Sequence, residues 1–461
     1  MSRVIPFVPA ALHGSDDPAL LDDVGGPIWS WRRLVEESNR WITVNSGLLI
    51  FLYCRNRPSD VAALLGLVAG GNSVALLDGA LPQEARDRLK AQYSPDLIVE
   101  DAVASVFDLR AIPSGGRIHP DNAVLLSTSG STGSPKFVRL SLSQLESNAA
   151  GIAETLDIDV GEVGSGHLPF HYSYGLSVLT SHLCRGAPLL LSERGFMDGA
   201  FWKALAAQKV RHLPGVPYHY QMMQRLNVAR LPLSGVRVMT QAGGALPVDV
   251  REQFWSFMEA KGGRFHVMYG QTEAAPRMTT LAHEDFPAAP TSVGRALPGG
   301  RIDILGPDGA PVAVGQSGVV VYAGPNVMLG YAQSRTDLAL GDMMQSTLET
   351  GDLGFLDASN RLTLVGRANR IVKVVGLRIN LDDIEAGLSR VGIDVAVTAS
   401  GDRLRVHHAA PPNFGEEGAA ILREHVLSFT SLPVGVLEFV RHDSLPRTTR
   451  GKIDRSALDP S

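Results

Sequence analysis

The amino-acid sequence predicts an α/β fold, because two regions alternate short apolar runs with longer amphipathic runs. These regions lie between residues 26 and 122 and between residues 201 and 268. The short runs are typical of buried strands, and the longer runs have the spacing of helices. Strands that alternate with helices form largely parallel sheets with helices on both faces. The length of 461 residues allows about two or three domains.

Composition and charge are those of an ordinary globular protein. The formal net charge is only -5 and the sequence has no long basic run, so we do not expect nucleic acid as the main partner. The two cysteines, Cys54 and Cys184, are too few for a disulfide framework or a thiolate metal site. Residues 47–54 form the longest apolar run, which is too short to cross a bilayer. No secretory cleavage pattern is clear near the N-terminus, so we expect a cytoplasmic protein.

The first alternating region predicts helices and strands in strict succession. Ser30 is placed to cap the first helix, and Pro58 begins the second. The expected helices are 31–42, 58–71 and 81–93, and the expected strands are 47–53, 73–78 and 96–101. A further helix is expected at 141–156, with Ser141 or Ser143 near its cap. Because residues 201–268 repeat the alternation, they imply a second sheet.

Residues 125–138, LLSTSGSTGSPKFV, pass from an apolar strand pattern into a run of Gly, Ser and Thr. Gly130 and Gly133 can adopt backbone angles that let successive N–H groups converge on phosphate oxygens. Hydroxyl groups and one cation complete this candidate anion site: Thr128, Ser129, Ser131, Thr132 and Lys136. A flexible linker is the alternative, but linkers lack a buried strand in front. Lys136 follows Pro135 rather than Gly, which argues against a Walker A loop and hence against a P-loop NTPase.

This run resembles the phosphate loop of the adenylate-forming (AMP-binding) superfamily, which includes acyl- and aryl-CoA synthetases, peptide-synthetase adenylation domains and luciferases. Further stretches resemble the family in the same order. MYGQTEAAPRM is similar to its Tyr-Gly-x-Thr-Glu, which implies that Tyr269 stacks on adenine, Thr272 contacts the α-phosphate and Glu273 binds Mg²⁺. In the Thr-Gly-Asp turn, Asp352 is expected to bind the ribose hydroxyls. The other nucleotide-binding residues implied by the resemblance are Gly243, Gly244, Ala245, Gly270, Gln271 and Arg367.

The stretch HLPFHYSYGLSVLTSHL, residues 167–183, resembles the family's lining of the acid pocket. Counting back three positions from Gly175 places Tyr172 as the pocket ring, with His171 beside it. Amino-acid-activating relatives carry Asp where this chain has Gly175, which implies an acid without an α-amino group. Tyr174, Val216 and Ala274 complete the candidate pocket and favour a hydrophobic or aromatic acid.

Two alternatives for this stretch remain. The histidines His167, His171 and His182 have no Glu or Cys at ligand spacing, so packing or surface roles are favoured over a metal site. Tyr172 and Tyr174 are also compatible with ordinary core packing.

The C-terminal part carries two more stretches of resemblance. GRANRIVKVVGLRINLDDIE, residues 366–385, is similar to the family's hinge and the first strand pair of its small C-terminal domain. Asn369 stands where the family usually has the hinge Asp, and the resemblance assigns a thiol tunnel to Lys373, Gly376 and Arg378. LPRTTRGKIDRSAL is similar to the family's closing stretch and makes Lys452 the catalytic lysine. A solvated basic tail is the alternative explanation for Arg447, Arg450, Lys452 and Arg455.

The resemblance therefore implies a domain plan. Residues 1–365 would form a large adenylation core of two mixed or parallel sheets with flanking helices, including a β-rich barrel or ribbon at about 291–356. Residues 366–370 would form a hinge, and residues 371–461 a small mobile α+β domain.

The implied activity is the ATP- and Mg²⁺-dependent conversion of a carboxylic acid to an acyl-adenylate, with release of pyrophosphate. The acyl group would then pass to the thiol of CoA, or to the phosphopantetheine of an acyl carrier protein. An adenylating amide ligase, an amino-acid adenylation enzyme and a non-catalytic nucleotide-binding homologue are the alternatives. We expect no membrane partner, and a monomer or homodimer.

Overall fold

The computed structural model describes most of the chain and divides it into two compact units. The described residues are 4–23, 28–42, 45–102, 116–127, 136–367, 370–374, 377–389, 393–400, 403–409, 422–424, 426–427, 434–447 and 453–458. The first unit comprises Met1–Ile302 and Tyr322–Leu348, and the second comprises Asp303–Val321 and Glu349–Ser461. This division differs from the sequence-based plan, because residues 303–321 and 349–365 belong to the second unit. The hinge at 366–370 stays a prediction.

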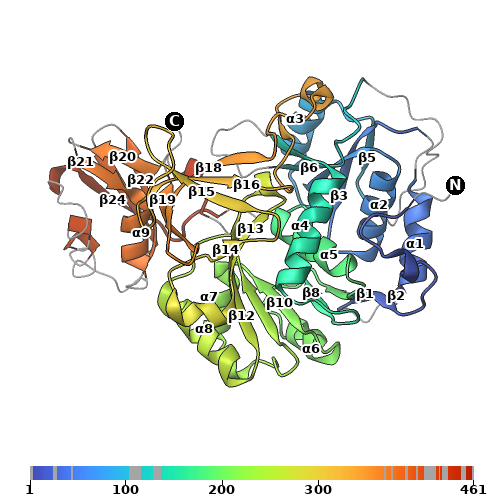
Figure 1. Cartoon of the computed structure of the whole chain (residues 1–461), viewed down its shortest axis with the longest axis horizontal. Coiled ribbons are helices and arrows are strands. Elements are labelled where there is room, and N and C mark those ends of the chain that lie inside the picture. Colours follow the sequence, from blue (N-terminus) through green and yellow to red (C-terminus); the bar gives the residue numbers. More distant parts are fainter. Residues whose placement is uncertain are drawn as a thin grey trace. The chain divides into compact units, whose positions relative to one another are not determined.

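The first unit contains a six-stranded mixed sheet in the order β17-β7-β6-β4-β3-β5 (Figure 1). Its strands are β3 (Leu49–Cys54), β4 (Ser73–Asp78), β5 (Leu97–Val99), β6 (Val124–Ser127), β7 (Phe137–Leu140) and β17 (Gly330–Ala332). Strands β3 to β6 run parallel, whereas β7 and β17 are antiparallel to their neighbours. All six residues of β3 are buried, as expected for a parallel strand covered on both faces.

A nine-stranded sheet of the first unit has the order β14-β13-β12-β11-β10-β8-β9-β1-β2. Its strands are β1 (Pro18–Asp22), β2 (Trp29–Ser30), β8 (Gly164–Gly166), β9 (Leu189–Leu191), β10 (His212–Gly215), β11 (Val238–Gln241), β12 (Arg264–Gly270), β13 (Arg277–Leu281) and β14 (Arg295–Ala296). Strands β10, β11 and β12 are parallel neighbours, so their carboxyl ends open at one edge. This edge is where α/β sheets usually bind ligands.

Helices cover and join these sheets. The α-helices of the first unit are α1 (Trp31–Arg40), α2 (Pro58–Ala69), α3 (Gln83–Tyr93), α4 (Leu142–Thr155), α5 (Ser173–Leu183), α6 (Gly199–Ala207), α7 (Pro217–Arg225) and α8 (Val248–Ala260). Its 3-10 helices are η1 (Ala10–Leu12), η2 (Val228–Arg230), η3 (Thr272–Ala274), η4 (His283–Ala288) and η5 (Arg335–Ala339). In Figure 1, α4 and α5 lie side by side, with α4 against β13 and α5 against β8 and β9. One core cluster joins α2, α4 and α5 to strands of both sheets.

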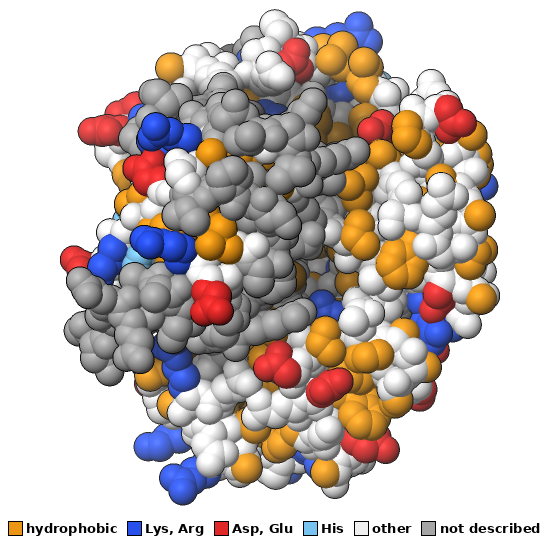
Figure 2. Space-filling model, turned by 90° about the vertical axis from the view of Figure 1, so that its left-hand side faces the viewer, with side chains coloured by type: hydrophobic (Ala, Val, Ile, Leu, Met, Phe, Trp, Pro, Cys, Tyr) orange, Lys and Arg blue, Asp and Glu red, His pale blue; other side chains and the backbone are white. Residues whose placement is uncertain are grey.

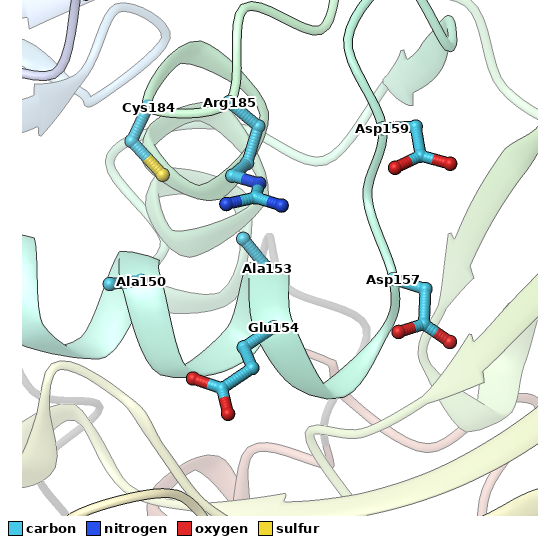
Figure 3. A pocket seen from close by; sticks show the side chains of 7 residues that line it. All are labelled: Ala150, Ala153, Glu154, Asp157, Asp159, Cys184 and Arg185. Carbon is cyan, nitrogen blue, oxygen red and sulfur yellow. The ribbon is translucent and has the colours of Figure 1, made fainter.

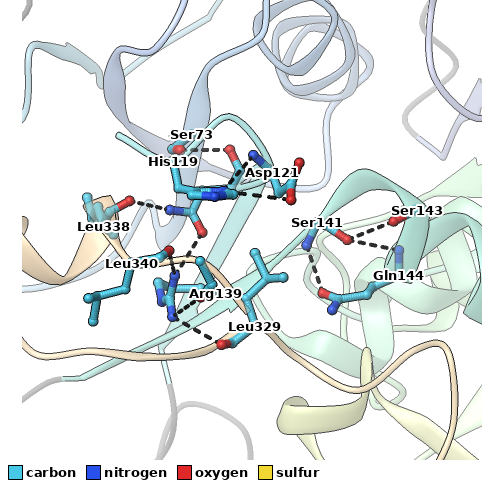
Figure 4. A network of polar contacts seen from close by, with 12 residues as sticks. Ser73, His119, Asp121, Arg139, Ser141, Ser143, Gln144, Leu329, Leu338 and Leu340 are labelled. Carbon is cyan, nitrogen blue, oxygen red and sulfur yellow. Dashed lines mark hydrogen bonds and ion pairs between the residues drawn. The ribbon is translucent and has the colours of Figure 1, made fainter. Parts of the chain in front are cut away.

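Two predicted helix caps are confirmed. The Ser30 hydroxyl accepts from the backbone N–H of Arg33, and Ser141 and Gln144 form a reciprocal capping box at the start of α4 (Figure 4). Just before α4, the buried Arg139 of β7 donates to the carbonyl oxygens of Leu329 and Gly341, each at 3.1 Å (Figure 4). The guanidinium thereby ties residues 329–341 to the six-stranded sheet.

The β-rich stretch expected at 291–356 is present but is not a separate barrel. Four strands form a sheet in the linear order β15-β16-β18-β19, namely β15 (Arg301–Leu305), β16 (Gly318–Ala323), β18 (Thr347–Leu356) and β19 (Leu362–Arg367). The other two strands of this stretch, β14 and β17, belong to the two large sheets instead. Hydrogen bonds to strands that are distant in the sequence place β14 and β17 in the large sheets. Local sequence patterns do not predict such pairings.

The second unit is α+β in its C-terminal part. Its further elements are β20 (Ile371–Val374), β21 (Leu377–Asn380), α9 (Leu381–Ser389), β22 (Asp394–Ser400), β23 (Arg403–Ala409), η7 (Val434–Val436), β24 (Leu437–Arg441) and η8 (Arg455–Ala457). Strand β23 pairs antiparallel with β22 and parallel with β24, and α9 packs on β22. Ile384, Leu388, Val397 and Val406 are fully buried in the resulting core.

The surface of the described residues carries mixed charge. Figure 2 shows Lys and Arg side chains interspersed with Asp and Glu on one face, with no continuous basic area among the residues described there. Within the described part of the chain, no helix has both the length and the apolar character needed to cross a membrane.

Candidate active site

The turn between β12 and β13 carries the predicted Tyr-Gly-x-Thr-Glu residues and is tightly constrained. A Cβ on Gly270 would lie 1.8 Å from the carbonyl oxygen of Pro276, so this close approach requires glycine. Asn326 donates its side-chain amide to the carbonyl oxygens of Ala274, at 2.6 Å, and Arg277, at 3.1 Å. Because the turn is held at both ends, the side chains between them have fixed positions.

Glu273 lies in this turn and connects to the predicted phosphate loop through a tyrosine. The Tyr331 hydroxyl donates to Glu273 Oε1 at 2.8 Å, and Lys136 Nζ lies 3.6 Å from the Tyr331 ring centroid. Burial and the Glu273 carboxylate both raise the pKa of Tyr331, so its hydroxyl stays protonated and remains a donor. Lys136 stands at the exit of the predicted loop, so the tyrosine that binds Glu273 also contacts the residue at this exit.

The Glu273 carboxylate suits a hard cation. The side chain is half-buried, and among the described residues its second oxygen accepts no hydrogen bond. Within the described ranges, no group of three or more His, Cys, Asp or Glu side chains could hold a metal ion. A Mg²⁺ ion at Glu273 would therefore take its other ligands from phosphate oxygens and water, as Mg²⁺ commonly does.

Thr272 contacts the first residue of a helix. Its Oγ1 lies 3.1 Å from the Oγ of Ser173, the first residue of α5. The free N–H groups and dipole of a helix N-terminus favour negative charge nearby. The hydroxyl pair and the helix end are thus a suitable place for an anionic group.

Three of the predicted pocket residues, Tyr172, Tyr174 and Val216, lie near Gly243 beyond the carboxyl ends of β10 and β11. A Cβ on Gly243 would lie 2.4 Å from the Tyr172 hydroxyl oxygen and 3.2 Å from Val216 Cγ1. Gly243 also has φ of +82°, which favours glycine. The Tyr172 and Tyr174 rings lie edge to face, with centroids 6.3 Å apart. The structure therefore brings the pocket residues next to the glycine turn predicted for adenine.

Gly175 does not face open space. A Cβ there would lie 2.1 Å from the Pro169 carbonyl oxygen and 2.6 Å from that of Leu168. A side chain at this position would require the preceding backbone to move. The expectation of an acid without an α-amino group stays a prediction. A glycine that allows α5 to approach the preceding backbone cannot be distinguished by sequence from one that lines a pocket.

The histidines of this region have separate surroundings. His171 Nε2 lies 3.7 Å from Asp78 Oδ2, at the end of β4, and its place in the acid pocket stays a prediction. His167 Nδ1 shares a hydrogen bond of 2.8 Å with the Ser165 hydroxyl. The His167 ring packs against the rings of Phe196 and Phe201. Burial lowers the pKa of His167 well below its usual value, as expected for a packed neutral ring.

In the second unit, Asp352 and Arg367 pair across β18 and β19. Arg367 Nε donates to Asp352 Oδ1 at 3.1 Å, and the Asp352 backbone N–H donates to Thr350 Oγ1 at 3.1 Å. Asp352 is buried whereas the Arg367 side chain is 58% exposed. Both residues were selected from sequence, and the antiparallel register places them directly opposite each other.

Several predicted residues lie outside the described part of the chain: Thr128, Ser129, Gly130, Ser131, Thr132, Gly133, Asn369, Gly376 and Lys452. The backbone places Lys373 opposite Arg378 in the pair formed by β20 and β21. The side chains of these two residues also lie outside the described part of the chain.

The residues on both sides of Lys452 are described. Arg447 and Ile453 form an antiparallel bridge, and the Asp454 N–H donates to the Pro446 carbonyl oxygen at 2.8 Å. Arg447 pairs with Asp394 at 2.6 Å, and Arg455 pairs with Glu385 at 2.5 Å. These two arginines are therefore anchored, which contradicts a purely solvated basic tail.

Residues 10–332 match the model of the family described as AMP-binding enzyme. The chain belongs to the AMP-binding enzyme family. Its α/β fold is that of adenylating enzymes: o-succinylbenzoate CoA synthetase (MenE) from Bacillus subtilis, in complex with its acyl-adenylate intermediate, has a TM-score of 0.79 and 21% identity over 96% of this chain and 95% of that one. The same protein with ATP and a magnesium ion has a TM-score of 0.77, with 21% identity and 96% coverage of each chain.

The sequence relatives of this AMP-binding enzyme include a CoA ligase and a peptide synthetase. The 2-succinylbenzoate–CoA ligase of Bacillus velezensis is 26% identical, over 93% of this chain and 91% of its own length. CymA, a probable non-canonical nonribosomal peptide synthetase of Salinispora arenicola, is 27% identical over the whole chain. The chain spans only 6% of the length of CymA.

Sequence reasoning did not single out three residues that contact the candidate site residues Thr272, Glu273 and Tyr174, namely Ser173, Tyr331 and Arg277. Ser173 begins a predicted helical run, and Tyr331 lies in the Gly-containing stretch MLGYA, so neither stands out. Arg277 lies four residues after Glu273, inside the stretch MYGQTEAAPRM, which is the one indication that the sequence offers.

One hollow of the first unit lies away from these residues. It has a volume of about 490 Å³ and lies between α4 and the end of α5 (Figure 3). Its lining residues are Ala150, Ala153, Glu154, Asp157, Asp159, Cys184 and Arg185. Three carboxylates against one arginine disfavour an anionic ligand, and burial raises the pKa of Cys184 to about 11, so this thiol is not a ready nucleophile.

Proposed function

We propose that this AMP-binding enzyme activates a carboxylic acid with ATP and passes the acyl group to a pantetheine thiol. The observation that carries the proposal is the arrangement around Glu273. A carboxylate suited to Mg²⁺, a lysine at the exit of the predicted phosphate loop and a hydroxyl pair at a helix N-terminus occur on neighbouring elements. The candidate acid pocket begins at the same edge of the sheet.

The chemistry of the first step explains why these groups are needed. The acid's carboxylate oxygen forms a bond to the α-phosphorus of ATP, and the bond from that phosphorus to pyrophosphate breaks. Both reactants are anions, so neutralisation of charge and alignment matter more than proton transfer. Bound Mg²⁺ supplies positive charge to the phosphates. Thr272, Lys136 and Lys452 are proposed to orient the phosphates and the attacking carboxylate.

In the proposed second step, a thiol attacks the acyl carbon and AMP leaves. The leaving group is good, so a strong activating base is not required. A turn of the C-terminal domain about Asn369 would withdraw Lys452 and bring the stretch from Lys373 to Arg378 to the acyl group. The CoA ligase among the relatives supports CoA as acceptor, and the peptide synthetase supports a carrier protein.

Acid-dependent release of pyrophosphate tests the first step, and thioester formation from supplied acyl-adenylate tests the second. Lys452→Ala should abolish acid-dependent pyrophosphate exchange and spare the second step. Lys203→Ala, on the exposed face of α6, is the matched control and should change neither. Exchange retained in Lys452→Ala would remove this lysine from its role. Offering CoA, a carrier protein and amines with the same acid separates a thioester ligase from an amide ligase.

A further inference from the structure

Arg277, the first residue of β13, is buried, and no charged side chain among the described residues pairs with it. The residue is 2% exposed, and its Nη1 contacts the thioether sulfur of Met268 at 3.2 Å. Its Cζ lies 4.7 Å from the Tyr174 ring centroid. Among the described residues, the guanidinium forms no ion pair and its Nε donates to no acceptor. The Met268 thioether is a weak hydrogen-bond acceptor, and the Tyr174 ring attracts a cation less strongly than a carboxylate does. The positive charge of Arg277 is therefore poorly compensated.

The other two buried arginines of the described chain show how this fold normally satisfies a guanidinium. Arg139 donates to several backbone carbonyl oxygens, as Figure 4 shows. Arg251 donates to the carbonyl oxygens of Leu246 at 2.8 Å and Ser292 at 3.2 Å. Burial of a charge without such partners is costly. Burial also lowers the pKa of Arg277, but arginine remains charged at neutral pH.

The position of Arg277 connects it to the candidate acid pocket. Arg277 is paired with Gly270 in the β-ladder, and residues directly opposite each other share one face of a sheet. On this face lies the N-terminal end of α5, which provides the Tyr174 ring. The Tyr174 hydroxyl is already bonded to Thr240, at 2.8 Å from its Oγ1, so it does not compensate the charge.

We propose that Arg277 binds a second carboxylate of the acid substrate, so that the enzyme activates dicarboxylic acids. One carboxylate would react beside Thr272, and the other would pair with the guanidinium. This proposal rests on the proposed function. A guanidinium and a carboxylate form two parallel charge-assisted hydrogen bonds, which are strong in a water-poor site. An acid with an apolar end would leave the guanidinium unpaired, and a site built around a polar partner strongly rejects an analogue that lacks it. The aromatic walls expected from sequence remain compatible with the body of such an acid.

Matched acid pairs test the proposal with the full chain. Terephthalic acid is compared with 4-methylbenzoic acid, and glutaric acid with pentanoic acid, in pyrophosphate release with ATP and Mg²⁺. Within the pair that the enzyme uses, we expect kcat/KM to be at least about 100-fold higher for the diacid. Arg277→Met should remove most of this ratio, mainly by raising KM for the diacid, and should leave KM for ATP unchanged. Arg277→Lys keeps the charge and should retain part of the ratio.

A second readout does not depend on turnover. The diacid should raise the melting temperature of the wild-type chain and not that of Arg277→Met, which by itself should melt at or above the wild-type temperature because an unpaired buried charge is gone. Arg251→Met is the control, since it removes a buried guanidinium whose partners are carbonyls; it should lower the melting temperature and keep the diacid ratio.

The possible failures are distinguishable. If no acid in a broad panel releases pyrophosphate, the proposed function fails, and this inference fails with it. If acids are used but the methyl-ended partner is as good as the diacid, in wild type and Arg277→Met alike, only the inference is overturned. If Arg277→Met raises KM for ATP with every acid, the guanidinium binds a phosphate, and the dicarboxylic assignment is wrong.

Discussion

Tyr331→Phe provides a direct test of how Glu273 is held. The substitution removes the hydroxyl that donates to Glu273 Oε1 at 2.8 Å, while the ring that faces Lys136 stays in place. A hydrogen bond to a charged group contributes about 1.5–3 kcal/mol. That free energy corresponds to about a 10- to 150-fold change in an equilibrium constant. If the bond orients Glu273 for Mg²⁺, the concentration of Mg²⁺ needed for half-maximal activity should rise by at least about 10-fold.

The assay is pyrophosphate release at fixed ATP over a series of Mg²⁺ concentrations. Tyr93→Phe is the matched control, because the hydroxyl of the buried Tyr93 donates at 2.8 Å to the carbonyl oxygen of Ala332, the residue next to the half-buried Tyr331. Both variants should lose some stability, but only Tyr331→Phe should change the Mg²⁺ dependence. Identical Mg²⁺ curves for the two variants would refute the reasoning that Tyr331 acts through Glu273.

Two further predictions concern stability and the loop that contains Lys452. Burial lowers the pKa of His182 and His266 from 6.5 to about 3 in the folded chain. The unfolded chain takes up these protons below pH 6.5 and the folded chain does not, so stability falls as the pH drops below 6.5; at pH 5.5 each histidine costs about 1.4 kcal/mol. Urea unfolding at pH 7.5 and 5.5 measures this loss, and His266→Leu should reduce it, whereas an unchanged pH slope would contradict the assignment. Glu385→Gln removes the carboxylate that pairs with Arg370 and Arg455, each at 2.5 Å. This change should destabilise the C-terminal part by about 3 kcal/mol. It should also lower adenylation, measured by pyrophosphate exchange, more than thioester formation, measured by thioester yield. Equal losses in the two half-reactions would indicate a purely structural role.

The sequence was informative where local patterns decide the structure. Alternating apolar runs predicted β3, β4 and β5 of one large sheet and β10, β11 and β12 of the other, and the serine positions predicted two helix caps that the structure confirms. Family resemblance selected Asp352 from a Thr-Gly-Asp turn and Arg367 from the stretch that begins at Gly366, and the structure pairs them. In these cases the information lies within a few residues of each site.

The sequence failed where distant segments decide the outcome. Tyr331 contacts Glu273 only because β17 joins β7, a pairing of residues almost two hundred positions apart. Arg277 follows a recognisable stretch, yet its burial under Tyr174 depends on how α5 packs. For Gly175, the deciding contacts are backbone atoms of the preceding turn, which leave no trace in composition.

The first unit is discontinuous along the chain, and this limits how the protein can be cut and recombined. A fragment that ended at residue 302 would lack the segment Tyr322–Leu348, and with it β17 and the carbonyl oxygens that Arg139 requires. Its buried guanidinium would lose those acceptors, and Glu273 would lose its tyrosine. An exchange of adenylating modules between proteins should therefore keep the segment Tyr322–Leu348 with the first unit, because β17 in this segment completes the six-stranded sheet.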